Sequence, residues 1–588
     1  MAARAGQTGR RTGRRPSGAT PLGPQERAEA LRRLEEQVFD VLVVGAGVTG
    51  AGVALDAATR GLSVALVEAR DYAAGTSSRS SKLIHGGLRY LEQLDVGLVR
   101  EALRERALLL DRLCPHLTRP VSFLYPLTGR VWERAYVGAG IALYDTLGGR
   151  GRRVRRHRHL TRRGALRAMP GLRPDALVGA IQYDDGQVDD ARHTLFVART
   201  AVHYGAVAAT SARVTGLLQE GGTVVGATVR DLETGHVVEV RARHVVNAAG
   251  VFTDALQAMA PGRSGLRVRA SKGIHLVVPR DRIASTTGLI TRTPHSVLFL
   301  IPWQDTHWLV GTTDTEWDLD LSHPAASRRD IDYLLEQANR VLARPLTHDD
   351  VVGVYAGLRP LLAGESEATS KLSREHAVVT PVPGMTLVAG GKYTTYRVMA
   401  RDAVDAAVAG WDEPVPASCT EDVPLLGAEG FRAAWNGRAA LAEAHGLPLA
   451  RVERLLGRYG TLVADVLAPV QDRPDLCQPL AGAPDYLRAE VLYAATAEGA
   501  LHLDDVLTRR TRISIETLDR GTAAAQEVAE LVAPVLGWDD AVAAREVDHY
   551  RMRVQAERDS QTRTDDRTAD AARLGAPDVR AGSLPLGA

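Results

Sequence analysis

Three glycines spaced as G-x-G-x-x-G mark the first place where this chain could do chemistry. Gly45, Gly47 and Gly50 follow the apolar run 41–44 and open a segment with helical periodicity. In such a strand–turn–helix unit the first glycine makes the turn, the second admits a pyrophosphate to the backbone, and the third lets helix and strand pack closely. Glu68 ends the next strand-like segment, where a carboxylate would accept adenosine ribose hydroxyls. The pattern predicts a dinucleotide site.

A second phosphate contact is predicted after that strand, where residues 75–81 read GTSSRSS. The segment 245–250, VVNAAG, is another short apolar strand that ends in small residues, as though the chain returned to the same cofactor. A nicotinamide-binding domain would instead continue as a doubly wound unit. FAD is therefore favoured over NAD, and these two segments add the cofactor-binding candidates Thr76, Ser77, Ser80, Ser81, Ala249 and Gly250.

Lysine is rare in this chain, with four among 72 basic residues, so arginine carries almost every positive charge. Three of the four lysines lie in motifs flanked by glycines or hydroxyls: Lys82, Lys272 and Lys392. Lys82 follows the hydroxyl-rich loop. We expect its compact charge to contact the flavin or its phosphates, where a planar guanidinium would not fit.

The segment 390–410, GGKYTTYRVMARDAVDAAVAG, predicts a helix that begins after two glycines and that Thr394 or Thr395 can cap. A helix N-terminus with a lysine beside it would stabilise the negative charge that a reduced flavin develops at N1 and O2. Gly391, Lys392 and Thr395 are therefore further cofactor-binding candidates. The alternative is an ordinary capped helix with a solvated lysine.

These motifs need a large scaffold, and 588 residues exceed what one hydrophobic core usually supports. Alternating strand-like and helical segments predict an α/β fold with an inserted antiparallel region, followed by Ala- and Leu-rich helical periodicity. The expected organisation is a disordered basic tail at 1–36, a FAD-binding and substrate domain at 37–410, a C-terminal helical domain at 411–555 and a disordered tail at 556–588.

Bulk composition excludes several classes of protein. A formal net charge of +2 argues against a whole-surface polyanion binder. Three cysteines, far apart and in no metal-ligand spacing, predict no metal site and a reduced, cytoplasmic compartment. No apolar stretch is long enough to span a bilayer. The Arg-rich start lacks the apolar region of a secretory signal, and a transit peptide is the less favoured alternative.

Taken together, the ordered motifs resemble those of the FAD-dependent glycerol-3-phosphate dehydrogenases. They cover about residues 39–397, with 501–513 resembling that family's C-terminal helical domain, and include GAGVTGAGVALDAATRGLSVALVEA, GTSSRSSKLIHGGLRYLE, VVNAAGVFTD, SKGIHLVVP, VGTTDTE, YAGLRPL and GGKYTTYR. The resemblance implies a fold like D-amino-acid oxidase and non-covalent FAD. It also implies oxidation of sn-glycerol 3-phosphate to dihydroxyacetone phosphate, with hydride passing from C2 to flavin N5 and electrons to a membrane quinone.

By the same resemblance the substrate pocket would contain Arg89, Tyr90, His275, Arg359 and Lys392. A phosphate dianion suits a planar arginine plus a further cation, so we assign phosphate capture to Arg89 with Arg359 or Lys392 in support. Alcohol oxidation needs a base for the hydroxyl proton. His275 is the favoured base and His85 is the alternative.

The segment 149–163, GRGRRVRRHRHLTRR, is unusually basic. It suits either a solvated loop or docking on an anionic lipid surface, where each basic residue contributes about 1 kcal/mol. Docking would make the protein cytoplasmic and peripheral on the inner face of the cell membrane.

Two rival functions stay open. One is a soluble glycerol-3-phosphate oxidase that reduces O2 to H2O2. The other is a flavin-containing nucleic-acid-binding protein, disfavoured because no aromatic interleaving or recognised module is present, so no nucleic acid partner is expected. A homodimer through the helical domain also stays open.

Overall fold

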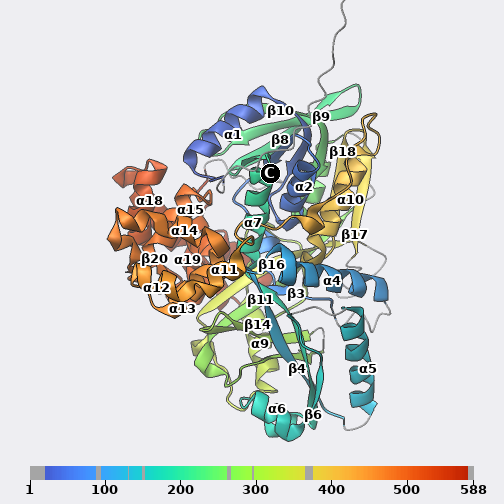
Figure 1. Ribbon diagram of the computed structural model, residues 1–588, viewed down its shortest axis with the longest axis vertical. Helices are drawn as coiled ribbons and strands as arrows, with labels where there is room; N and C mark the ends of the chain where they lie inside the picture. The colour runs from blue at the N-terminus through green and yellow to red at the C-terminus, as the bar shows by residue number, and fades with distance from the viewer. Residues whose placement is uncertain are drawn as a thin grey trace, which may run out of the picture.

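The computed structural model describes residues 20–87, 95–129, 132–148, 153–260, 266–294, 297–363 and 375–580. Figure 1 shows two lobes along the long axis, one built on a sheet containing β1 (Val38–Val44) and the other on a sheet containing β4 (Thr118–Leu127). The C-terminal helices, orange to red, gather on one side of the molecule beside the junction of these lobes.

We call the sheet that contains β1 sheet A. Its strand β1 precedes the G-x-G-x-x-G turn. β1 pairs in parallel with both of its neighbours. Val41 and Val43 pack into the core on one face of the sheet, and Leu42 and Val44 pack into the core on the other. Burial on both faces is why this strand is a continuous apolar run. The strand order is β17 (His376–Val382), β18 (Met385–Gly390), β10 (Val237–Asn247), β1, β2 (Val64–Val67) and β7 (Val207–Ala209). In addition, β9 (Thr223–Asp231) pairs with β10, and β8 (Ala212–Glu220) pairs with β9.

Three helices cover one face of sheet A and a fourth covers the other. α2 (Val48–Thr59), α7 (Asp190–His203) and α10 (Tyr396–Val408) share one core, whereas α1 (Pro24–Glu36) packs into the core of the opposite face. A Cβ on Gly52 would lie 2.9 Å from the Tyr396 ring. The small residues of α2 therefore let α10 approach closely.

We call the sheet that contains β4 sheet B. It forms the second lobe, and its strands are mostly antiparallel. Its order is β15 (Thr315–Trp317), β11 (Val268–Pro279), β14 (His307–Gly311), β13 (Val297–Trp303), β12 (Gly288–Arg292), β4, β6 (Gly179–Val188) and β3 (Leu83–Ile84), with β16 (Gly353–Leu362) on β11 and β5 (Arg158–Thr161) on β6. The helices of this lobe are α4 (Val96–Leu108), α5 (Trp132–Leu147), α6 (Arg162–Ala168) and α9 (Arg328–Asn339). The short α8 (Thr253–Gln257) follows β10.

The C-terminal part is helical, with two apolar cores of its own. Its elements are α11 (Phe431–Asn436), α12 (Arg438–His445), α13 (Leu449–Tyr459), α14 (Val463–Leu467), β19 (Pro479–Leu480), β20 (Ala483–Leu487), α15 (Arg488–Thr496), α16 (Leu503–Asp505), α17 (Ile513–Glu516), α18 (Ala525–Leu536), α19 (Asp540–Thr562) and α20 (Asp566–Arg573).

The prediction of disordered tails was wrong wherever the structure describes them. Residues 24–36 form α1, and its Leu34 is completely buried. Beyond residue 556 the chain continues through α19 and α20. The shortage of large apolar groups that suggested disorder is offset by ion pairs with the folded body: Arg27 pairs with Asp231, and Lys272 pairs with Asp566. Residues 1–19 and 581–588 lie outside the described ranges.

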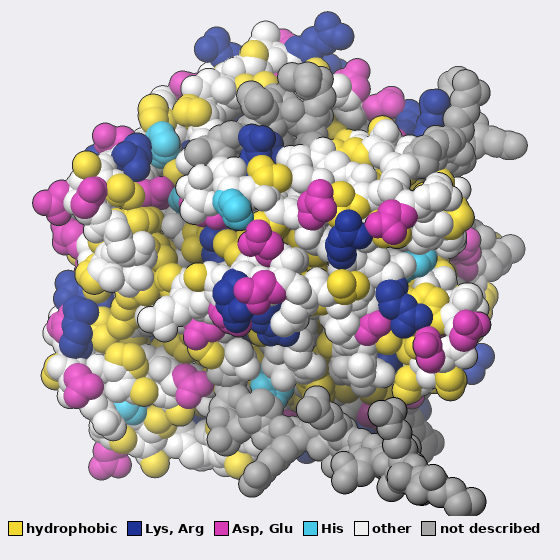
Figure 2. Space-filling model, turned by 90° about the horizontal axis from the view of Figure 1, so that it is seen from above, with side chains coloured by type: hydrophobic (Ala, Val, Ile, Leu, Met, Phe, Trp, Pro, Cys, Tyr) yellow, Lys and Arg dark blue, Asp and Glu magenta, His cyan; other side chains and the backbone are white. Residues whose placement is uncertain are grey.

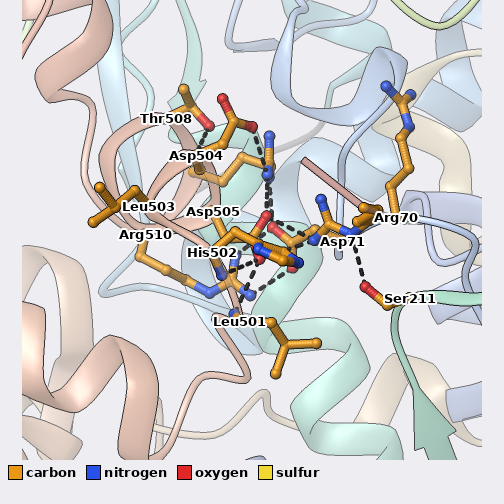
Figure 3. A network of polar contacts seen from close by, with 12 residues as sticks. Arg70, Asp71, Ser211, Leu501, His502, Leu503, Asp504, Asp505, Thr508 and Arg510 are labelled. Atoms are coloured by element: carbon orange, nitrogen blue, oxygen red, sulfur yellow. Dashed lines mark hydrogen bonds and ion pairs between the residues drawn. The ribbon is translucent and has the colours of Figure 1, made fainter. Parts of the chain in front are cut away.

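A buried ionic network connects the helical domain to the sheet A lobe (Figure 3), and Arg580, at the end of the described chain, takes part in it. Asp71, in the loop after β2, accepts hydrogen bonds from Arg510 at 2.6 and 2.7 Å. Asp505 accepts from Arg580 at 3.0 Å, and Arg580 also donates to Ser211 Oγ at 2.7 Å. Burying this many charges is tolerated because each has a partner of opposite sign.

Next to this network, His502 is the titratable residue in a second contact between the helical domain and the sheet A lobe. Its ring nitrogens contact Glu546 at 2.9 Å and Glu233, on the sheet A lobe, at 3.0 Å. Burial and Arg580 act to lower the pKa of His502, but hydrogen bonds to the two glutamates outweigh them and raise it to about 9. The imidazolium therefore stabilises the folded state at neutral pH.

Because the folded pKa lies above the unfolded one, this stabilisation is complete below about pH 6.5 and is lost as the pH rises through about 9. We expect His502→Gln to lower the free energy of unfolding by up to about 3 kcal/mol at pH 6 and much less at pH 9.5. Urea unfolding at both pH values measures this, with the exposed His236→Gln as control. An equal loss at both pH values would contradict the assignment.

Surface charge is mixed rather than concentrated. On the face seen in Figure 2, dark-blue basic and magenta acidic side chains are interspersed, in keeping with the small net charge of +2. Within the described ranges, no helix is both long enough and apolar enough to cross a membrane.

Candidate active site

A cavity of about 360 Å³ brings together most of the residues predicted to hold cofactor and substrate. Its walls come from the G-x-G-x-x-G turn, the loop after β2, the turn after β10, and strands β11 and β16. The predicted residues that line it are Gly45, Gly47, Glu68, Thr76, Ser77, Ser80, Ser81, His85, Ala249, Gly250, His275, Arg359, Gly391 and Lys392.

The glycine turn has the geometry that a bound pyrophosphate needs. Gly45 has a φ of +103°, and a Cβ there would lie 2.7 Å from the Ala248 carbonyl oxygen. Gly47 precedes α2 and provides no side-chain cap, which leaves room at the helix N-terminus. Gly50 lies behind the cavity wall, where a Cβ would be 1.8 Å from the Gly45 carbonyl oxygen. Its role is to let α2 pack against the turn.

Glu68 is fixed at the edge of the cavity by the backbone. Its Oε2 accepts a hydrogen bond from the Ala46 amide at 2.8 Å, and its Oε1 accepts one from the Arg70 amide at 2.9 Å. Each oxygen keeps a further lone pair. The carboxylate is thus held in place and able to accept ribose hydroxyls.

The chain returns to the cavity twice, as the sequence indicated, but Thr395 does not line it. Gly391 has a φ of +76°, a conformation that favours glycine, and Lys392 follows it. Thr395 is buried, and its hydroxyl donates to the Lys392 carbonyl at 3.4 Å instead of capping α10. Thr394 is also no cap, because its hydroxyl bonds the backbone of His85.

The predicted flavin contact of Lys82 is not what the structure shows. Lys82 is completely buried, and its Nζ pairs with Asp190 Oδ1 at 2.8 Å and donates to the Ser78 carbonyl at 3.1 Å. It lies outside the cavity wall, 4.9 Å from the centre of the Tyr355 ring. Burial and the neighbouring Arg512 lower its pKa. The compact ammonium is used because it fits this closed space, not because it meets the cofactor.

Strands β11 and β16 place the substrate-side residues on one face. Ser271 is paired with Arg359, and His275 with Tyr355, so alternate residues of both strands point to the cavity side. Arg359 Nη2 donates to Thr312 Oγ1 at 3.1 Å and to the Thr313 carbonyl at 3.0 Å. Lys272 lies on the opposite face and pairs with Asp330 and Asp566.

His275 is held as a neutral imidazole. Its ring stacks on Tyr355 with centroids 4.9 Å apart, and its Nε2 lies 2.8 Å from Ser81 Oγ. Burial, assisted by Arg359 and Lys82, lowers the pKa of His275 well below its ordinary value. Within the described part of the chain its Nδ1 has no hydrogen-bond partner. In the tautomer whose Nε2–H donates to Ser81, Nδ1 is therefore the basic atom.

Arg89 and Tyr90 lie outside the described residues. Sequence reasoning missed Tyr355, Thr312 and Thr313, which position His275 and Arg359. The signal for Tyr355 was its spacing of four residues from Arg359 on a strand, which places the two side chains on one face.

Comparisons with known proteins agree with this geometry. The model of the FAD dependent oxidoreductase family matches residues 40–397, and the model of the C-terminal domain of alpha-glycerophosphate oxidase matches residues 418–543. The glycerol-3-phosphate dehydrogenase of Mycobacterium leprae is 59% identical over 562 residues, 96% of either chain. The human mitochondrial glycerol-3-phosphate dehydrogenase is 36% identical, covering 88% of this chain and 73% of its own.

The fold comparison points the same way. The structure of the glycerol-3-phosphate dehydrogenase from Bacillus halodurans complexed with FAD superposes with a TM-score of 0.75 at 29% identity, covering 91% of this chain and 98% of the other. This confirms the predicted FAD-binding α/β fold with a C-terminal helical domain, and the glycine turn and Glu68 fit FAD as the cofactor. The chain belongs to the FAD-dependent glycerol-3-phosphate dehydrogenases.

Proposed function

We propose that this protein oxidises sn-glycerol 3-phosphate to dihydroxyacetone phosphate and passes the electrons to a membrane quinone. The observation that carries the proposal is the shared face of β11 and β16, where His275 and Arg359 line the same cavity as the glycine turn. One cavity thus offers a base, a phosphate partner and a cofactor cradle.

The roles of the residues follow from their surroundings. Arg359, with a guanidinium already oriented by Thr312 and Thr313, binds the substrate phosphate together with Arg89, the residue assigned to phosphate capture from the sequence. Lys392 adds a second positive charge to the cavity. Bound FAD supplies the hydride acceptor for C2. His275, neutral at pH 7, takes the hydroxyl proton. The incoming dianion offsets the charge of Arg359, which raises the proton affinity of His275 at the moment that a base is needed.

The reductive reaction is tested by mixing the FAD-loaded protein with sn-glycerol 3-phosphate without oxygen. Loss of the oxidised flavin absorbance and formation of one dihydroxyacetone phosphate per flavin would support the proposal. A flavin that stays oxidised would refute it. The acceptor is tested by comparing turnover with a soluble quinone analogue against turnover with O2, since faster reduction of O2 with release of H2O2 would favour the oxidase.

An exposed apolar surface beside arginines supports the proposal of a membrane acceptor. α5 stands at the edge of the sheet B lobe (Figure 1), and three large apolar side chains on it are exposed: Trp132 by 79%, Tyr136 by 51% and Leu143 by 43%. Their spacing places them along one helix face. The helix packs near β5, whose basic surroundings include exposed Arg156 and Arg158. We name this surface, formed by these five residues, the α5 surface. Apolar residues beside arginines are typical of helices that lie on anionic membranes.

We expect the triple change Trp132→Ser, Tyr136→Ser and Leu143→Ser to lower binding to vesicles of phosphatidylglycerol by at least about ten-fold, because it removes the apolar contact. Co-sedimentation measures this. Leu518→Ser, at a site that is 67% exposed elsewhere, is the control. Unchanged vesicle binding by the triple variant would rule out the α5 surface as the docking site.

A further inference from the structure

A second cavity, of about 910 Å³, lies where the helical domain meets sheet B. Its walls come from β4 and the ends of β6 and β13, from the start of α7, and from α11 and α13 of the helical domain. No residue lines both this interdomain cavity and the cofactor cavity. Its size is typical of a site for a small molecule.

The lining of the interdomain cavity is strongly basic. Four carboxylates line it, of which Asp189 is paired with Arg512 and Glu453 with Arg438, leaving Asp305 and Asp485. Seven arginines also line it: Arg119, Arg153, Arg192, Arg432, Arg451, Arg454 and Arg458. Three of them pair with glutamates outside the lining, Arg192 with Glu498, Arg454 with Glu516 and Arg458 with Glu490. Four arginines therefore remain against two carboxylates, an excess of positive charge.

Three of these arginines are held by neutral oxygens only. Arg119 donates to Gln187 Oε1 at 2.7 Å, Arg153 to the Leu110 carbonyl at 2.8 Å, and Arg451 to the Pro484 carbonyl at 2.6 Å. Among described residues these three guanidinium groups form no ion pair within 4.0 Å, and the carboxylates of Asp305 and Asp111 act on Arg119 and Arg153 only from a longer range. Burial lowers the pKa of both Arg119 and Arg153. Cations short of negative partners in a partly desolvated cavity favour an anionic ligand.

Two buried side chains that line the interdomain cavity also have polar atoms without hydrogen bonds. Arg458 is 3% exposed and His116 is 4% exposed. In the described structure, neither Nη1 of Arg458 nor either ring nitrogen of His116 has a hydrogen-bond partner. Burial and Arg192 lower the pKa of His116 to about 3, so its ring is neutral and still offers one N–H donor. Buried donors of this kind normally have partners.

An aromatic wall completes the cavity. Phe431 and Trp435 project from α11 with ring centroids 5.9 Å apart. We propose that the interdomain cavity binds a small phosphorylated metabolite, with its phosphate held by Arg119, Arg153 and Arg451. This site is independent of the substrate pocket and of the function proposed above. A nucleotide would use both the basic and the aromatic wall, whereas a simple phosphate ester would use only the first.

The test uses the full-length, FAD-loaded protein and isothermal titration with pyrophosphate and, separately, with ADP. The double variant Arg119→Gln and Arg451→Gln is expected to raise the dissociation constant for pyrophosphate at least about ten-fold, because two charge-assisted hydrogen bonds are lost. Arg328→Gln, which removes an exposed arginine of α9, is the matched control and should bind normally. An unchanged KM for sn-glycerol 3-phosphate would show that the double variant is folded.

Arg359→Ala separates this site from the active site, because that variant should still bind pyrophosphate. Absence of heat with both probes, equal binding by the double variant, or loss of binding in Arg359→Ala would each overturn the proposal. Trp435→Ala distinguishes a nucleotide from a simple phosphate ester as the ligand. Weaker binding of ADP with unchanged binding of pyrophosphate would identify a nucleotide site, and no effect on either would identify a site for phosphate esters.

Discussion

His275→Asn is expected to retain FAD and to lose about 10²- to 10⁴-fold in kcat, the usual contribution of a general base. Asparagine can keep a hydrogen bond to Ser81 and contact Tyr355, but it cannot accept the hydroxyl proton. Anaerobic stopped-flow reduction of the flavin by sn-glycerol 3-phosphate measures the step directly. The flavin spectrum of the variant reports whether the cofactor site is intact.

His85→Asn is the matched control for this experiment, because His85 also lines the cavity and is the alternative base. If His275 is the base, His85→Asn should reduce the flavin within about ten-fold of the parent rate, below the range expected for loss of a base. The reverse pattern, a large loss in His85→Asn and a small one in His275→Asn, would transfer the assignment to His85.

Arg359→Ala is expected to lower kcat/KM by about 10²- to 10³-fold, because it removes a charged partner from a partly desolvated phosphate site. The Arg359 side chain is only 21% exposed, and its guanidinium is oriented by Thr312, Thr313 and, at 3.6 Å, the carboxylate of Asp314 before substrate arrives. Steady-state kinetics with sn-glycerol 3-phosphate, compared with glycerol, measures the effect. Glycerol carries no phosphate, so the variant and the parent should oxidise it equally slowly.

Two further variants test whether Arg359 binds the phosphate as a planar pair of donors. Arg359→Lys keeps the charge but loses the planar pair of donors, so it should lie between the parent and alanine variants. Arg269→Ala removes an arginine of the neighbouring strand β11, one that pairs with Glu316, and should leave kcat/KM unchanged. A phosphate preference that survives in Arg359→Ala would show that another residue captures the phosphate.

Local patterns were sufficient to predict much of the cofactor site. The turn at Gly45, the helix after Gly47 and the position of Glu68 depend on residues within one short strand–turn–helix–strand unit. Steric limits on the backbone restrict that unit to few conformations, so residue type and spacing indicate its geometry. The alternation along 271–275 and 355–359 likewise determines which side chains share a face once the strands pair.

Lys82 is a residue whose surroundings could not be predicted from local sequence patterns. Its neighbours in the sequence are those of a cofactor loop, but its partner Asp190 is 108 residues away and is positioned by α7. No spacing within residues 75–92 carries that information. Burial of the ammonium against Tyr355 follows from the packing of the two lobes, and this decides whether the charge faces the cofactor or an ion pair.

The C-terminal segment depended on tertiary structure in the same way. Residues 566–580 contain few large apolar side chains, and a segment that cannot bury such groups is normally disordered. Here Asp566 and Arg580 are matched by Lys272 and Asp505 on the folded body, so partners already fixed in space compensate the cost of ordering. The sequence by itself determined the family, the cofactor and the local shape of its cradle. Only the tertiary structure decided which charges face the cavity and which hold the domains together, because ion pairs between distant segments leave no periodic signal in the chain.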